Sequence, residues 1–336
     1  MRRPDTPLPP LRRRALLLRA LGPACLPARA AAAAAPSWPR GPVRQTLAYP
    51  PGGASDEVAR AMAERLAVAL GVPVRLDYVP GAGGAVALEA LTHTAPDGQA
   101  LCFCAINPLT VMPHLSPQRY ALLRGVVPVA AVMATPALVA GTPALAARGF
   151  KAMIDDARRA PAHLRWATSG VATTGHLLLE QVRRASGVDI THVPYKGGGQ
   201  QISDALAGHF EVLSSNVAGL QLELVAQRRL TALAVGASAR LSVLPHTPTL
   251  AELGYPAANL SSVFAIFAPP LTPPPLVQRL NRLIDTAVRE PVLLQRLISA
   301  GNEALGGTPA ELVERIEHES AQHRELLQAN PEAFRS

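Results

Sequence analysis

Short apolar runs alternate along this chain with stretches whose apolar residues recur at helical spacing. The first run, 43–49, predicts a strand. A helix is expected directly after it, over 57–70, where apolar side chains occupy every fourth position: Val58, Met62, Leu66 and Leu70. The turn between the two contains two prolines and two glycines, which suit a tight backbone.

The alternation continues in two series. Strands are expected at 73–78, 100–106 and 126–133 in the first, and at 164–168, 190–193, 210–214 and 230–236 in the second. Helical patterns lie between most of these strands, which predicts an α/β fold with a mostly parallel sheet. Because the second series is complete by itself, it predicts a second domain.

The end of the chain has one strand pattern, 263–268, followed by three helical patterns at 276–289, 291–300 and 309–329. Three helices without strands do not form a domain, so we expect them to cover the first sheet. The chain would then cross between domains twice, near 135–143 and near 261–269. We expect one lobe at 43–138 and 265–330, and a second lobe at 139–264.

Two α/β lobes joined by two extended crossovers are typical of a hinge-closing binding protein. In open sheets of this kind a ligand lies outside the carboxyl ends of the strands, which here means in a cleft between the lobes.

The formal net charge of +8 comes almost entirely from the N-terminus. Residues 1–40 contain eight arginines and one aspartate, so residues 41–336 carry only +1. The body of the protein therefore offers no electrostatic footprint for nucleic acid.

The first residues have the order of a secretory signal: arginines, a largely apolar stretch at 15–26, and a run of alanines at 30–35. We expect residues 1–35 to be a signal peptide, with its boundary between 30 and 37, and the mature protein to be periplasmic. Arg12-Arg13-Arg14 also resembles a twin-arginine signal, so both the Sec and the twin-arginine routes stay open. A basic tail on a cytoplasmic protein and a lipid anchor at Cys25 are weaker alternatives.

Two cysteines, Cys102 and Cys104, remain after the signal. They lie two positions apart on an expected strand, where both side chains point to one face and a strain-free bridge between them is difficult. Buried small side chains are favoured over a metal pair. We expect no metal and no cofactor.

Four loops fall at the carboxyl ends of expected strands. The first, 49–56, leads from a strand into a helix, and such glycine turns present N–H donors and the positive end of a helix dipole to an anion. Alone, this turn fits an ordinary strand-to-helix connection equally well. The others are 79–84, 169–176 and 193–199, each rich in glycine or small polar residues.

Motifs for catalysis are missing from these loops. The sequence has no Gly-x-Ser-x-Gly elbow, no histidine pair at metal-binding spacing and no Walker-type loop. A triad built on Ser169 and His176 stays open as an alternative, since triads are spatial arrangements. We expect no enzyme activity.

Several motifs in order resemble one known family. They are Tyr-Pro-Pro-Gly-Gly-Ala-Ser-Asp (49–56), Pro-Gly-Ala-Gly-Gly (80–84), Ala-Pro-Asp-Gly (95–98), Thr-His-Val-Pro-Tyr-Lys-Gly (191–197), Leu-Thr-Ala-Leu-Ala-Val (230–235) and Leu-Pro-His-Thr-Pro-Thr-Leu-Ala-Glu-Leu-Gly (244–254). With them, residues 43–328 resemble the Bug-type substrate-binding proteins of tripartite tricarboxylate transporters. The resemblance implies a periplasmic-binding-protein-like type II fold that encloses a small carboxylate.

The resemblance also implies the ligand-binding residues. The loop from Tyr49 to Asp56 would hold one carboxylate through backbone amides, and Thr173 and Thr174 would hold the distal end of the ligand. Asp56 is assigned to capping the helix and ordering the loop. The full expected set is Tyr49, Gly52, Gly53, Ala54, Ser55, Asp56, Gly83, Gly84, Asn107, Ser169, Thr173, Thr174, His176, Tyr195 and Asn216.

Some cleft positions depart from the family pattern. Tyr49 replaces a phenylalanine and adds a hydroxyl near the cleft, Ala85 replaces an asparagine, and Val263-Phe264 stands where the family has a tryptophan. The ligand is therefore left open within the carboxylates.

We expect an exported, monomeric receptor that captures a small organic acid by lobe closure and delivers it to membrane transporter subunits. Two alternatives are kept: a receptor of the same fold that reports ligand to a signalling partner, and an exported hydrolase.

Overall fold

The computed structural model describes residues 38–52, 54–118, 120–195 and 197–334. Residues from Trp38 onward form one compact unit. The expected signal peptide lies outside the described residues, as does Gly53 in the first loop.

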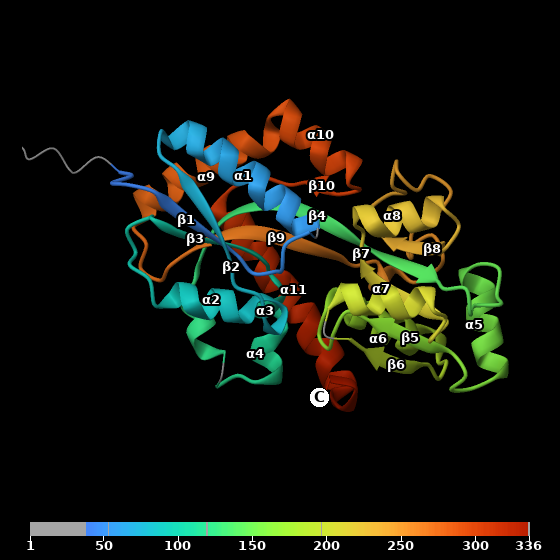
Figure 1. Cartoon of the computed structure of the whole chain (residues 1–336). Helices are drawn as coiled ribbons and strands as arrows, with labels where there is room; N and C mark the ends of the chain where they lie inside the picture. The colour runs from blue at the N-terminus through green and yellow to red at the C-terminus, as the bar shows by residue number, and fades with distance from the viewer. Residues whose placement is uncertain (1–37, 53, 119, 196, 335–336) are drawn as a thin grey trace, which may run out of the picture. The chain divides into compact units, whose positions relative to one another are not determined.

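The elements follow the sequence pattern closely (Figure 1). The strands are β1 (Val43–Leu47), β2 (Val74–Tyr78), β3 (Ala100–Ala105), β4 (Val127–Gly141), β5 (Arg165–Thr168), β6 (Thr191–Pro194), β7 (Val212–Asn216), β8 (Thr231–Gly236), β9 (Ser261–Ala268) and β10 (Glu303–Ala304). The helices are α1 (Ala54–Leu70), α2 (Ala85–Thr92), α3 (Asn107–Thr110), α4 (Met112–Leu115), α5 (Phe150–Arg159), α6 (Thr174–Ser186), α7 (Gly198–Leu206), α8 (Gly219–Ala226), α9 (Pro274–Arg289), α10 (Pro291–Ser299) and α11 (Pro309–Ala329). Short 3-10 turns are η1 (Ala82–Gly84), η2 (Ala121–Gly125), η3 (Pro256–Ala258) and η4 (Pro331–Phe334).

The strands form one continuous ladder in the order β2-β1-β3-β9-β4-β7-β5-β6, with β8 and β10 also paired to β4. The pairs β1-β2, β1-β3, β5-β6 and β5-β7 are parallel, whereas β4 and β9 run antiparallel to all their partners. The expectation of a mostly parallel sheet was therefore wrong. Strands β4 and β9 make the sheet mixed because they connect the two series instead of belonging to either repeat.

Strand β4 was expected to end near Met133 but continues to Gly141. Its residues up to Pro136 pair with β9, and its residues from Ala137 onward pair with β7 and β8. The first crossover is thus a single strand that serves both halves of the sheet. The second crossover leads into β9. Leu260, directly before this strand, accepts a hydrogen bond from the Ala137 amide at 3.3 Å. The boundaries given above for the two lobes remain a proposal.

The last helices cover the first half of the sheet only in part. Helix α9 packs on β4 and α1, as expected. Helix α11 begins with the capping box that Thr308 and Glu311 form, contacts α3 and β4, and then reaches α6 of the second half. Helix α11 therefore covers part of the first half, and its 21 residues also carry it to the second half.

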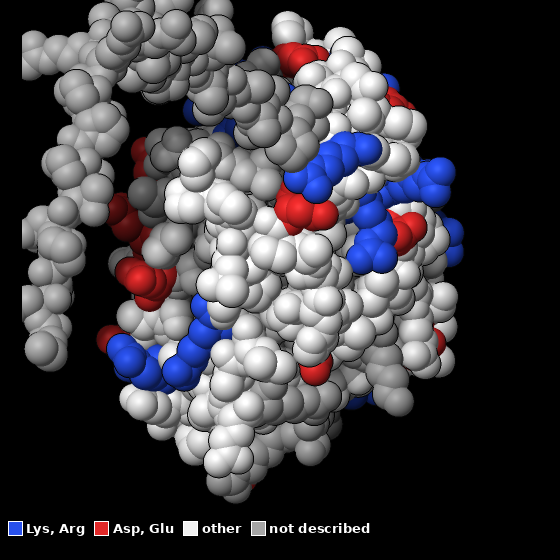
Figure 2. Space-filling view, turned by 90° about the vertical axis from the view of Figure 1, so that its left-hand side faces the viewer, with Lys and Arg blue, Asp and Glu red and all other residues white. Residues whose placement is uncertain are grey.

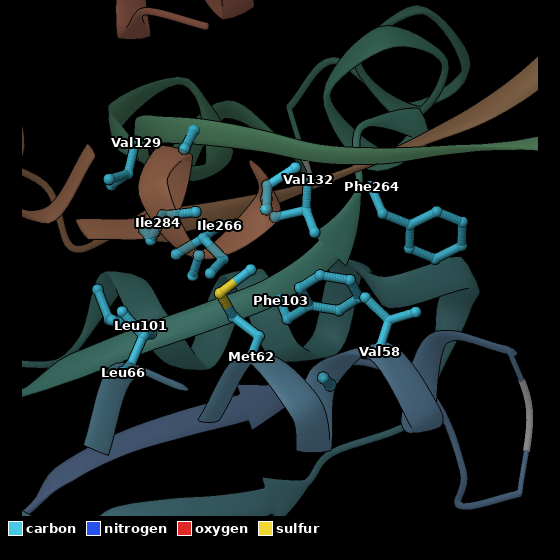
Figure 3. Packing of buried hydrophobic residues seen from close by; sticks show 14 of the residues in the cluster. Val58, Met62, Leu66, Leu101, Phe103, Val129, Val132, Phe264, Ile266 and Ile284 are labelled. Atoms are coloured by element: carbon cyan, nitrogen blue, oxygen red, sulfur yellow. The ribbon is translucent and has the colours of Figure 1, made fainter. Parts of the chain in front are cut away.

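Helix α1 shows how the pattern becomes a core (Figure 3). Its residues Val58, Met62 and Leu66 are at most 3 % exposed and pack toward Phe103 of β3 and Ile284 of α9. Fully burying one such side chain contributes about 1.5–3 kcal/mol. The helix is therefore fixed on the sheet, and so is the loop that precedes it.

The surface agrees with the near-neutral charge of the body. On the face drawn in Figure 2, basic and acidic side chains are interspersed among uncharged ones. Among the helices of the described residues, none has the length and hydropathy to cross a membrane.

The second glycine turn, 79–84, packs closely against β3. Gly84 has φ +109°, and a Cβ there would lie 2.4 Å from Cys104 Sγ, whereas a Cβ on Gly83, at φ +64°, would meet nothing within 4 Å. We predict that Gly84→Ala lowers the free energy of unfolding by about 3 kcal/mol, from backbone strain and overpacking combined.

Gly83→Ala is the matched control, because it introduces the same methyl group at a positive φ without the collision. It should cost about 1 kcal/mol. Urea unfolding measures both variants, and equal losses would show that contact with Cys104 does not close the turn.

Candidate functional site

A chain of hydrogen bonds joins the two halves of the protein at their junction. The Asn107 amide donates to Thr174 Oγ1 at 3.4 Å, Thr174 Oγ1 lies 2.7 Å from Ser262 Oγ, and Ser262 Oγ donates to Asn216 Oδ1 at 2.7 Å. Three of these residues were expected at the site from sequence. Ser262 was not, and it connects Thr174 to Asn216.

The topology explains why these side chains meet. Asn107 opens α3 directly after β3, Thr174 opens α6 after β5, and Asn216 ends β7. Along β4, Thr135 is opposite Ser262 and Ala137 is opposite Asn216. Ser262 and Asn216 therefore flank the point where the pairing partner of β4 changes from β9 to β7. Loops from the carboxyl ends of strands in both halves therefore converge there.

Helix α6 presents an uncapped N-terminus to the same region. Its N-cap residue, Thr173, makes no side-chain cap and instead donates its hydroxyl to the Gly170 carbonyl at 2.8 Å. A helix start with unclaimed amides and a positive dipole end favours an anion. Gly175 allows the close packing behind it, since a Cβ there would lie 2.7 Å from the Ser214 carbonyl oxygen.

Asp56 orders the first loop. Its carboxylate accepts hydrogen bonds from the Gly52 amide at 2.8 Å, the Arg60 guanidinium at 3.0 Å and the Tyr78 hydroxyl at 2.7 Å. Burial acts to raise the pKa of Asp56, but the three donors together lower it. An ionised carboxylate with these partners orders the loop, while Ser55 beside it is buried.

Tyr49 turns its hydroxyl into the first half of the protein. It accepts a hydrogen bond from the Ala105 amide at 3.1 Å and donates to the Gly83 carbonyl at 3.2 Å. Burial, with Cys104 beside it, raises the pKa of this phenol well above its usual range. Tyr49 thus ties the second glycine turn to the end of β3, and its hydroxyl does not add a polar group to the junction.

Three other expected residues have partners away from the junction. The Tyr195 hydroxyl donates to Asp204 at 2.8 Å, and burial raises its pKa to about 12. His176 is fully buried, with Nδ1 accepting from the Ala172 amide at 3.1 Å and Nε2 3.6 Å from Glu180. Ser169 is half-buried in the loop before α6.

This arrangement does not support the triad alternative. Both Ser169 and His176 lie in the described part of the chain, and no hydrogen bond joins them. The ring nitrogens of His176 face Ala172 and Glu180 instead. We therefore leave His176 and Tyr195 out of the ligand-contacting set that we propose below.

A pocket of about 190 Å³ opens beside the hydrogen-bonded chain. Its lining is Asn107, Thr174, Leu177, Asn259, Leu260, Ser261, His318, Glu319, Gln322 and His323. The glycine turns do not line it. The sequence analysis did not predict Asn259, Leu260 and Ser261, near the start of β9, or the lining residues of α11. The Ser261-Ser262 pair at the start of an apolar strand was a usable signal, whereas α11 gave none.

The two cysteines that follow the expected signal peptide both lie on β3. Cys102 and Cys104 are both buried free thiols. Among the described residues, no group of three or more His, Cys, Asp or Glu side chains is placed to hold a metal ion.

Glu319 is an ionisable group in the pocket whose burial is only partly offset by a neighbouring charge. Burial raises the pKa of Glu319 to about 7, and Arg315, 3.9 Å away, lowers it only partly. Because the folded pKa exceeds the unfolded one, the folded state binds more protons between about pH 4.5 and 7. Stability is therefore lost as pH rises through that window.

We predict that Glu319→Gln removes this loss. Between pH 5 and pH 8 the wild-type free energy of unfolding should fall by about 2 kcal/mol relative to the variant. Chemical unfolding at both pH values measures it, with Glu317→Gln, an exposed position on the same helix, as control. Parallel pH curves for wild type and Glu319→Gln would contradict the prediction.

A family model and several known proteins match most of this chain. Residues 58–331 match the family model described as "Tripartite tricarboxylate transporter family receptor". The chain is 33 % identical to "Protein BugT" of Bordetella pertussis over 282 residues, which cover 83 % of this chain and 86 % of that protein.

Solved structures with the same fold include "R. palustris Rpa4515 with adipate", with 27 % identity, a TM-score of 0.80, and coverage of 87 % of this chain and 98 % of that one. "MatC (Rpa3494) from Rhodopseudomonas palustris with bound malate" has 24 % identity, a TM-score of 0.76 and coverage of 86 % and 100 %, and shows the fold alone.

The fold expectation is thereby confirmed: the chain is α/β with the two-lobed architecture of periplasmic binding proteins. Its family and fold are those of solute-binding receptors, not of enzymes. The chain belongs to the tripartite tricarboxylate transporter receptor family, and Bug-type proteins are among its relatives.

Proposed function

We propose that this protein binds a small carboxylate at the junction of its lobes and delivers it to a tripartite tricarboxylate-type transporter. One carboxylate group would lie at the first loop, 49–56, and the other end of the ligand would lie at the start of α6. The described members of the proposed ligand set are Gly52, Ser55, Gly83, Gly84, Asn107, Ser169, Thr173, Thr174 and Asn216, with Asp56 and Tyr49 ordering the loops. Gly53 and Ala54 belong to the proposed first loop.

The observation that carries the proposal is the hydrogen-bonded chain Asn107–Thr174–Ser262–Asn216. It joins neutral donors and acceptors from both halves at the carboxyl ends of their strands, beside the uncapped start of α6. Such a site can bind an anion without a matching positive side chain. That agrees with the near-neutral charge of residues 41–336.

Closure of the lobes would strengthen this binding. Neutral donors hold an anion weakly in water, and more tightly once water is excluded and the local dielectric constant falls. A structural neighbour at 27 % identity was solved with adipate, and this supports a dicarboxylate as the ligand class. We further propose export to the periplasm by the Sec or the twin-arginine route, and a monomeric state.

A thermal-shift screen of mono- and dicarboxylates tests the proposal on the purified mature protein. An acid present at 100 times its Kd should stabilise the protein by about 2.7 kcal/mol, which raises Tm measurably. Adipate and hexanoate form a useful pair, because they have the same carbon count and differ by one carboxylate. A screen in which no carboxylate raises Tm would contradict the proposal.

Thr174→Val tests the part of the site at α6. Valine keeps the shape of threonine but leaves Asn107 and Ser262 without their partner, so we expect the affinity for the bound dicarboxylate to fall by about tenfold. The affinity for a monocarboxylate of the same length should fall less, because its single charged group would lie at the first loop.

Calorimetric titration of wild type, Thr174→Val and Thr173→Val measures these losses. Thr286→Val, on the exposed face of α9, is the control. If the affinities for the dicarboxylate and the monocarboxylate fell equally, the start of α6 would not hold the distal end of the ligand.

A further inference from the structure

The C-terminal end of the chain docks against the helix that opens at the site. After α11, Asn330 donates its side-chain amide to Glu180 Oε2 at 2.7 Å, and Phe334 of η4 places its ring 4.6 Å from the His176 ring. Phe334 is only 4 % exposed. Both partners, Glu180 and His176, belong to α6.

A separate apolar cluster surrounds this contact. It contains Val111 from the segment after α3, Ala172 from the loop before α6, Leu177 from the first turn of α6, and the C-terminal residues Leu326, Leu327 and Phe334. The cluster therefore bridges both halves of the protein through the end of the chain. This is a third connection between the halves, beside the two crossovers.

Glu180 is the charged centre of the contact. It is 2 % exposed and has three partners: the Asn330 amide, the Arg183 guanidinium and, at 3.6 Å, Nε2 of His176. Burial acts to raise the pKa of Glu180, but His176 and Arg183 outweigh it and the pKa is lowered. Nε2 of His176 faces this carboxylate but makes no hydrogen bond.

Nδ1 of His176 accepts a hydrogen bond from the Ala172 amide at 3.1 Å, and an Nδ1 that accepts carries no proton. Ala172 has φ +61°, a left-handed conformation that costs a residue with a Cβ about 1–2 kcal/mol. Such a conformation persists where surrounding contacts fix it. Here the fixing contact is the hydrogen bond to His176.

The other end of the same loop is held through a second histidine. The His192 ring stacks on His176 with centroids 4.0 Å apart, and its Nε2 is 2.8 Å from Thr168 Oγ1. Burial, together with the neighbouring His176 and Arg183, lowers the pKa of His192 to about 3, so it is neutral at physiological pH. Thr168 in turn donates to the Gly170 carbonyl at 3.1 Å.

We propose that the C-terminal segment Asn330–Phe334 positions the half of the ligand site contributed by α6. The segment fixes His176 through Phe334 and Glu180. It thereby sets the conformation of the loop 169–173 and the direction in which the first amides of α6 point. Phe334, Asn330 and His176 are positioning residues in this scheme and do not touch ligand. The proposal rests on the proposed function and adds a determinant that lies 150 residues from its partner Glu180 in sequence.

The competing interpretation is that Phe334 only fills the apolar cluster. In that case its loss would lower stability, as the loss of any neighbour would, and the loop would keep its conformation. Leu327 offers the matched comparison, because it lies in the same cluster and is equally buried, at 5 % exposed. Leu327→Ala opens a cavity there while it leaves the contact between Phe334 and His176 in place.

The experiment compares Phe334→Ala with Leu327→Ala in two measurements. The first is hydrogen exchange at the Ala172 amide in protein without ligand, followed by NMR. We expect exchange to become at least tenfold faster in Phe334→Ala and to change less than threefold in Leu327→Ala, after correction for global stability. The second is affinity for adipate, which should fall by about tenfold in Phe334→Ala only.

Unchanged exchange at Ala172 in folded Phe334→Ala would overturn the inference, and so would equal changes in the two variants. If Phe334→Ala does not fold, Asn330→Asp is judged by the same criteria, since it places a second negative charge beside Glu180 and should release the segment. The exchange measurement needs no ligand. A wild-type protein that binds no carboxylate would therefore count against the proposed function, while the inference about the loop is still decided.

Discussion

Strand β4 is the constraint on which the rest of the structure depends. Its fifteen residues pair with β9 on one side of Pro136 and with β7 and β8 on the other, so two α/β halves share one strand. A shared strand fixes the relative register of everything attached to it. Ser262 and Asn216 are brought within hydrogen-bond distance because they pair with neighbouring stretches of β4.

The site uses neutral groups because its charged groups are already paired. Asp56 is held by Gly52, Arg60 and Tyr78, and Glu180 is held by Arg183, His176 and Asn330 behind α6. These buried carboxylates fix loops and helices, and the hydrogen-bonded chain beside the start of α6 consists of hydroxyls and amides. This arrangement suits the proposed binding and release of an anion, since neutral donors hold a charge strongly only when water is excluded.

The C-terminus adds a constraint that a two-crossover architecture does not require. Helix α11 and η4 connect the face of the first half to the back of α6 through an apolar cluster, a buried ion pair network and a ring contact. Relative motion of the lobes must therefore either keep this connection or break it. The pocket lined by Glu319 lies along the same helix, so the junction has ionisable groups on its α11 side that are absent from the hydrogen-bonded chain itself.

The sequence by itself determined most of the elements, the glycine turns and the family, because spacing, turn chemistry and ordered motifs act over a few residues. Only the tertiary structure decided which polar groups meet. Thr174 and Ser262 are 88 residues apart, and Asn330 and Glu180 are 150 apart. Tyr49 and His176 show the same limit: their types and loops were visible, yet the packing around them turned both side chains toward protein partners instead of the junction. No local pattern encodes that direction, since it depends on what the rest of the fold places beside each ring.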